Sequence, residues 1–151
     1  MATSFATELR EGYLQVAGFL CPEELAMVER ARDRVNVRAP ERDRLLAQIV
    51  CAYRSGPRQA WGPVILDLLA PDLIVMLQRF RPEPPTIDED EIRQQLVLEA
   101  LRAVVRIRLL EDGRWTRVRL FSRTYTRMLR WLAREGRRQR RKVSFGAEEE
   151  E

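Results

Sequence analysis

Apolar residues recur at helical spacing along most of the chain, and prolines divide the pattern into segments. Between Pro40 and Ser55 the apolar positions lie three or four residues apart, which is the period of an amphipathic helix. The stretches that follow Pro63 and Pro71 fit the same period, although such short apolar runs are also compatible with strands. Because no alternating pattern of useful length occurs, the sequence predicts an all-α fold.

Helix boundaries in the first part of the chain follow from proline and glycine positions. Pro22 and the acidic residues after it favour a helix start, and that helix is expected to run to about Val35. Residues 1–20 stay ambiguous, because Gly12 and Gly18 interrupt an otherwise helical spacing. Pro63 and Pro71 are each expected to open a short helix.

The second part of the chain contains two longer predicted helices. The proline-rich residues 81–85 predict an extended linker, after which Thr86 or Asp88 is expected to cap a helix. The apolar face of that helix is expected to contain Ile92, Leu96, Leu98 or Glu99, Ala103 and Val104. Beyond a turn at Asp112 and Gly113, a last helix is predicted from about Thr116 to Arg141.

These elements predict a compact bundle of five to six helices with a long basic helix at its C-terminal end. Apolar residues make up 45% of the chain, which is enough for a core. We divide the chain into an N-terminal helical arm (1–38), a central helical domain (39–142) and an acidic disordered tail (143–151).

Charge is unevenly distributed along the chain. The 27 basic residues, all arginine except Lys142, face 23 acidic ones, so that the net charge is only +4. Residues 114–142 alone carry +11, whereas residues 143–151 carry −4 and the rest of the chain carries −3. A basic block of this kind indicates a polyanion as partner.

The last predicted helix carries two stripes of residues along its length. A basic stripe contains Arg123, Arg127, Arg130, Arg134, Arg137 or Arg138, and Arg141. An apolar stripe, which we expect to be buried, contains Val118, Phe121, Tyr125, Met128, Leu129 and Leu132. Trp115, Trp131, Phe121 and Tyr125 also suggest stacking on single-stranded nucleic acid, with core packing the simpler interpretation for the last two. A solvated helix face is the alternative for the arginines.

Several functional classes are excluded or disfavoured by composition. The absence of histidine excludes a Ser-His-Asp triad and histidine-ligated zinc or haem. Cys21 and Cys51 are too few for a disulfide scaffold or zinc site and are expected to be reduced core thiols. Since we also find no glycine-rich phosphate loop, we expect no catalytic residue, metal or cofactor, and no enzyme. Without a long apolar run or signal peptide, a cytoplasmic protein that does not bind membranes is expected.

Two segments resemble region 2 of bacterial RNA polymerase sigma factors. They are the acidic and leucine-rich residues 88–101 and the basic residues 118–141, with 44–54 similar to the first helix of that region. The resemblance implies docking on core RNA polymerase through Ile92, Gln94, Gln95 and Leu98. It also implies capture of the promoter −10 element by Tyr125, Arg127, Arg130, Trp131 and Arg134. Nothing after Arg141 resembles the helix-turn-helix that reads the −35 element, so we expect a sigma-like protein without that domain.

The sequence is compatible with three functions. The first is a sigma-like transcription initiation protein that binds core polymerase and single-stranded −10 DNA. Its DNA-binding residues would be Arg123, Tyr125, Arg127, Arg130, Trp131, Arg134, Arg137, Arg138 and Arg141. The second is a basic helical DNA-binding regulator without polymerase contact. The third is a structural module whose arginine helix binds an acidic protein, and an anti-sigma factor is a further candidate partner.

Overall fold

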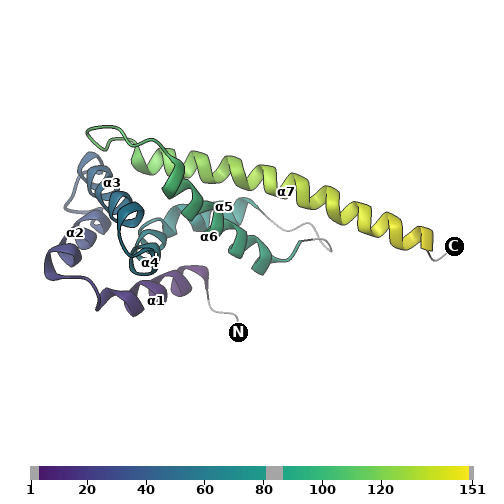
Figure 1. Cartoon of the computed structure of the whole chain (residues 1–151), viewed down its shortest axis with the longest axis horizontal. Coiled ribbons are helices and arrows are strands. Elements are labelled where there is room, and N and C mark those ends of the chain that lie inside the picture. Colours follow the sequence, from purple (N-terminus) through teal and green to yellow (C-terminus); the bar gives the residue numbers. More distant parts are fainter. Residues whose placement is uncertain (1–3, 81–86, 150–151) are drawn as a thin grey trace.

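The computed structural model describes residues 4–80 and 87–149, with side chains described up to residue 142. Over these residues the chain is all-α, as predicted, with seven helices and no strand. The helices are α1 (Phe5–Ala17), α2 (Pro22–Arg32), α3 (Ala39–Ser55), α4 (Arg58–Leu68), α5 (Ala70–Arg79), α6 (Glu89–Arg106) and α7 (Thr116–Glu149). Figure 1 shows α7 along one edge of the molecule and α1 at the opposite edge, with the other helices between them.

The N-terminal helices belong to the body of the fold. α1 begins after Ser4, whose hydroxyl accepts the Thr7 N–H, and continues through Gly12. Its buried residues Phe5, Leu9 and Tyr13 are part of the same apolar core as those of the other helices, and α1 packs on α4. The segment predicted as an N-terminal arm therefore shares one core with the segment predicted as the central domain.

The start of α2 explains the position of one cysteine. The Cys21 Sγ accepts the Glu24 N–H at 3.4 Å, and the Glu24 carboxylate accepts the Cys21 N–H at 2.9 Å, which together form a capping box. Both Cys21 and Cys51 are free and exposed, so the prediction of core thiols is wrong. Cys21 is exposed because it lies at the helix end, where its sulfur serves as the cap.

α4 begins several residues before Pro63, the residue at which its start was predicted. The prediction placed the helix start at Pro63, whereas the helix begins at Arg58 and contains Pro63 in its interior. A proline normally excludes the helical conformation for the residue before it, because the ring clashes with the preceding Cβ. Here that residue is Gly62, which has no Cβ, so the helix passes through the proline.

α4 and α5 form a bent pair at the centre of the fold. Their axes differ by 66°, and Pro71 lies in the first turn of α5 as predicted. Within the described residues no single helix has the length and apolar composition to cross a membrane, and only this bent pair passes that test jointly. Their apolar side chains Trp61, Ile65, Leu73 and Met76 are buried in the core.

α6 is held at both of its ends. Asp88 is the N-cap, and its carboxylate accepts the Asp90 N–H at 2.9 Å. At the other end, Arg54 of α3 donates from Nε to the Val104 carbonyl at 2.8 Å and also to the Ile107 carbonyl. A guanidinium at this position satisfies carbonyls that have no partner within the helix. The predicted linker at residues 81–85 and the alternative cap Thr86 lie outside the described residues.

α7 is rotated about its axis relative to the prediction. Its most deeply buried residues are Thr116, Leu120, Thr124 and Met128, which lie four residues apart. Val118 and Leu129, which were expected to be buried, are 55% and 47% exposed. Two threonines therefore occupy the buried line, and the Thr116 hydroxyl is satisfied there by donating to the Gly113 carbonyl at 2.5 Å. A prediction based only on the spacing of apolar residues misses these buried positions, because two of the four are threonines.

α7 also ends later than predicted. The helix was expected to end near Arg141 and to be followed by a disordered acidic tail, but its backbone is helical to Glu149. Residues 142–149 contain no proline, and a single glycine in a helix costs only about 1 kcal/mol. Glu150 and Glu151 of the predicted tail lie outside the described residues.

A buried carboxylate joins α6 to α7. Glu99 is 1% exposed and accepts hydrogen bonds from Gln95 (3.1 Å) and Arg102 (2.9 Å) on its own helix. It also accepts one from Arg127 Nε of α7 at 3.4 Å. Of the two residues that could have faced the core, Glu99 is therefore inside and Leu98 outside. A carboxylate is stable at this depth only because donors surround it.

We predict that Glu99→Ala lowers the free energy of unfolding by about 2–4 kcal/mol, because it removes three hydrogen bonds, one of which is the ion pair to Arg127 of α7. Chemical denaturation measures this change. Gln94→Ala, at an exposed position of the same helix, is the control and is expected to change stability by less than about 0.5 kcal/mol. A loss below about 1 kcal/mol for Glu99→Ala would contradict the role assigned to this carboxylate.

Candidate functional site

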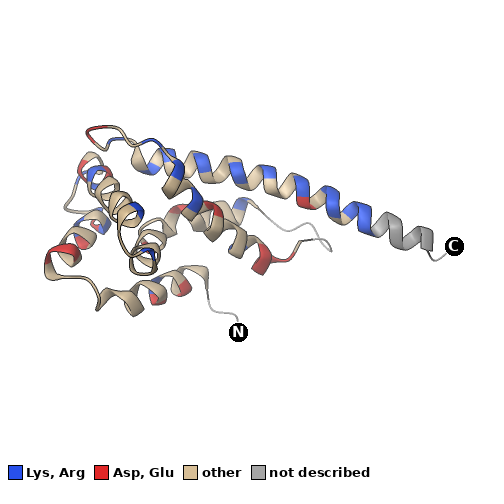
Figure 2. Ribbon diagram, in the orientation of Figure 1, with Lys and Arg blue, Asp and Glu red and all other residues tan. Residues whose placement is uncertain are grey.

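α7 carries exposed cationic residues along much of its length, and Figure 2 marks the positions of Lys and Arg in blue on the ribbon. We call this set the basic surface; it consists of Arg123, Arg130, Arg134, Arg137, Arg138, Arg140, Arg141 and Lys142. Among the described side chains, only Arg138 of this set forms an ion pair, with Glu135 at 3.7 Å. Most of the positive charge of α7 is therefore presented to solvent.

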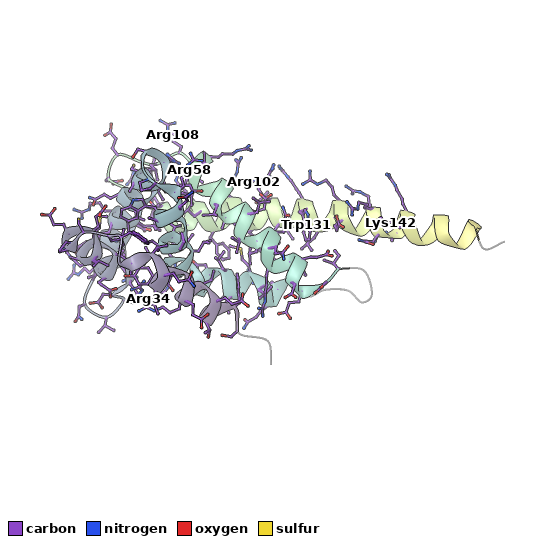
Figure 3. All side chains as sticks on the ribbon, turned by 60° about the horizontal axis from the view of Figure 1, so that its bottom comes forward. Arg34, Arg58, Arg102, Arg108, Trp131 and Lys142 are labelled. Atoms are coloured by element: carbon purple, nitrogen blue, oxygen red, sulfur yellow. The ribbon has the colours of Figure 1, made fainter. Side chains whose placement is uncertain are left out.

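The far part of the basic surface surrounds the helix instead of following one face. Five of the six residues from 137 to 142 are basic, and all five are exposed. α7 extends well past the other helices in Figure 1, and Figure 3 shows Lys142 on this extended part. The arginines nearer the start of α7 lie on one face, because the opposite sides pack on the body.

Arg127 differs from its neighbours on the predicted stripe. It is half-buried and bonds to Glu99, so that its charge is partly compensated. Arg102 of α6 bonds to the same carboxylate and is half exposed, which places a further cation beside α7. Arg102 was not predicted from the sequence, although its position three residues after Glu99 is the spacing of a helical ion pair.

Tyr125 is engaged inside the molecule. Its ring centroid lies 5.2 Å from that of Phe80 and 6.0 Å from that of Phe121, to which the ring is nearly parallel. The Arg79 guanidinium lies over the same ring at 5.9 Å. Core packing thus accounts for Tyr125, and the prediction that it contacts DNA receives no support from its position.

The two tryptophans of this region have different environments. Trp131 is half-buried and packs against the core, whereas Trp115 is 57% exposed and lies directly before α7. Trp115 also has a φ of 63°, which is unusual for a bulky residue. Two residues earlier, Gly113 has a φ of 72°, and a Cβ there would lie 2.8 Å from the Arg44 Cα. This tight turn holds Trp115 outward at the end of the basic helix.

The four predicted polymerase-docking residues do not form one surface. Ile92 is fully buried in the core, and Gln95 is half-buried and donates to Glu99. The Ile92 side chain is not available to a partner without opening of the fold, so the assignment of Ile92 to docking is wrong. Gln94 and Leu98 are exposed, and they lie four residues apart on one side of α6.

What this arrangement can do follows from its charge. Arginine side chains donate in forks that match phosphate and carboxylate oxygens. Apart from Arg138, the exposed arginines of the basic surface have no ion-pair partner among the described residues. The start of α7 is fixed, because Arg117 donates from Nε and Nη2 to Asp72 at 2.6 and 2.7 Å and its N–H donates to Asp43 at 3.0 Å. The basic surface is therefore carried on a helix whose start is anchored to α3 and α5.

Comparison of the chain with protein-family models, with curated proteins and with solved structures finds no match to any of them. The resemblance to region 2 of sigma factors rests on the residues of this chain alone.

Proposed function

We propose that the protein binds nucleic acid through the phosphate backbone, with the basic surface of α7 as its interface. The observation that carries this proposal is the concentration of eight exposed cations on one helix whose residues 116–142 contain a single acid, Glu135. An ordinary solvated helix mixes charges of both signs, because like charges at a spacing of four residues repel. A bound polyanion removes this repulsion.

The proposed mechanism is electrostatic. From Arg123 to Arg141 the surface extends for about 27 Å at roughly 1.5 Å per residue, enough to contact several phosphates in succession. The extended part of α7, with cations around it, has the width of an α-helix that the major groove of DNA admits. Each neutralised phosphate releases condensed counterions, which supplies most of the binding free energy.

A second candidate function is the sigma-like role in transcription initiation, which a specific observation favours. Gln94, Leu98 and Val105 follow one side of α6 and are all exposed, and Leu98 and Val105 are apolar. Such a row suits a helical partner surface, as docking on core polymerase would need. In this function, Trp115 is the ring that remains accessible for stacking on unpaired bases.

We predict that the double variant Arg130→Gln/Arg134→Gln weakens binding to duplex DNA about tenfold at moderate salt and lowers the salt dependence. The slope of log K against log salt should become less steep by about 0.9 for each lost phosphate contact. Fluorescence anisotropy over a salt series measures both quantities.

The matched control is Arg38→Gln/Arg44→Gln, which removes the same charge from exposed positions near the start of α3. It is expected to change affinity less than about twofold, since long-range charge effects are screened. Equal losses in the two double variants would show that net charge, not the basic surface, governs binding.

For the sigma-like function, we predict that core RNA polymerase retains the protein in a pull-down and that Leu98→Asp abolishes retention. A charge placed in an apolar contact is desolvated without a partner, which costs several kcal/mol. Val35→Asp, at an apolar residue that is exposed elsewhere, is the control. Failure of the unmodified protein to bind polymerase would remove this function and leave backbone binding standing.

Trp115 allows a separate test of base stacking. We predict that Trp115→Ala weakens binding to a single-stranded oligonucleotide by about 1–3 kcal/mol and leaves duplex affinity unchanged. Phe19→Ala, which removes an aromatic ring that is exposed far from α7, serves as the control. A uniform effect of Trp115→Ala on both nucleic acids would argue against stacking.

A further inference from the structure

A cavity of about 370 Å³ lies where α1, α2, α3, α4, α5 and the start of α7 meet. Five arginines line it, Arg10, Arg32, Arg34, Arg42 and Arg117, against two aspartates, Asp43 and Asp67. Its volume falls within the range of small-molecule sites, which begins at about 300 Å³. The cavity is thus large enough for a small ligand and strongly cationic.

Most of these arginines are partly compensated. Arg10 and Arg32 share the Asp67 carboxylate, and Arg32 also pairs with Glu29 at 2.7 Å. Arg117 uses its Nε and Nη2 for Asp72, which lies outside the lining. These contacts hold the guanidinium groups in place, and Arg117 keeps N–H groups that Asp72 does not use.

Arg34 and Arg42 supply the remaining donors. Arg42 gives one of its N–H groups to the Val37 carbonyl. Arg34 has no hydrogen-bond or ion-pair partner among the described residues. Burial and the positive charge of Arg117, opposed by Asp72, lower the pKa of Arg34 below its ordinary value. Arg34 is exposed to solvent, and because no carboxylate contacts it directly, its N–H groups remain available to a ligand.

Two helix ends add to the positive potential. Ala39 and Ala70, the first residues of α3 and α5, both line the cavity, and neither helix has a side-chain cap. The N-terminal end of a helix carries a partial positive charge, and its free N–H groups bind anions. The second residue of each helix is a proline, Pro40 or Pro71, which has no N–H, so the arginines supply most of the donors of the cavity.

We propose that this cavity binds the phosphate monoester group of a small molecule, with Arg34, Arg42 and Arg117 as its ligands. A phosphate monoester carries about −1.5 to −2 charges at pH 7 and has three strong acceptor oxygens, which match the unused donors. The remaining volume accommodates the organic part, beside the apolar residues Leu46, Leu68 and Ile74.

This site is distinct from the interface proposed above. Arg117 of the cavity packs toward α5 and α3, whereas the basic surface begins at Arg123 and faces solvent. In Figure 3, Arg34 lies on the side of the molecule opposite Arg102 and Arg108. The two sites can therefore be altered separately.

Isothermal titration calorimetry with the full chain in a phosphate-free buffer tests the proposal, using inorganic phosphate, adenosine 5′-monophosphate and adenosine as probes. We expect both phosphates to bind with a Kd of about 1 mM or tighter, corresponding to about −4 kcal/mol, and adenosine not to bind. Arg34→Gln should weaken both at least about tenfold, since a charged hydrogen-bond fork is lost. Arg108→Gln, at an exposed arginine outside the cavity, should change Kd less than about twofold.

The proposal is overturned if neither phosphate binds at about ten times the expected Kd, or if adenosine binds as well as its monophosphate. It is also overturned if Arg34→Gln binds both phosphates as the unmodified protein does. The variant Arg130→Gln/Arg134→Gln separates the two sites, because it should keep the affinity for the monophosphate. A tenfold loss in that variant would place the phosphate on α7 and would equally refute the cavity site.

Discussion

The buried carboxylate of Glu99 determines how α7 is mounted on the body of the fold. A carboxylate at 1% exposure is tolerated only with donors around it, and one of these is Arg127 of the neighbouring helix. This bond fixes which side of α7 faces α6. It also withdraws Arg127 from solvent while the arginines before and after it remain outside.

The rotation of α7 then decides which of its residues serve the core and which serve the surface. Tyr125 is turned toward Phe80 and Phe121 and is used in packing, whereas Val118 and Leu129 are left exposed. The eight cations of the basic surface gather where no other helix covers them. Because Arg117 anchors the start of α7 to Asp72, the exposed charge is carried on a rigid element.

The molecule presents positive charge in two forms that suit different ligands. On α7 the charge is open, extended and repeated, which suits a polymer with regularly spaced phosphates. In the cavity at the first turns of α3 and α5 it comes from five arginines that line one space, and the exposed Arg34 has no hydrogen-bond or ion-pair partner among the described residues. A small anion suits the second arrangement, because several arginines line the same cavity.

Local pattern was sufficient for the all-α class, for most helix positions and for the basic character of α7, because periodicity, capping residues and charge are properties of neighbouring residues. It did not decide between Leu98 and Glu99 as the core residue. It placed Ile92 correctly on the apolar face, whereas the resemblance to sigma factors implied a docking role for this buried residue. The side of a helix that is buried depends on partners far away in sequence: Glu99 needs Arg127, and the cavity needs arginines from four separate segments. Periodicity along one helix contains no information on those partners. Only the packing of the helices against one another therefore decided which charged side chains are buried, which are paired and which remain exposed to bind a ligand.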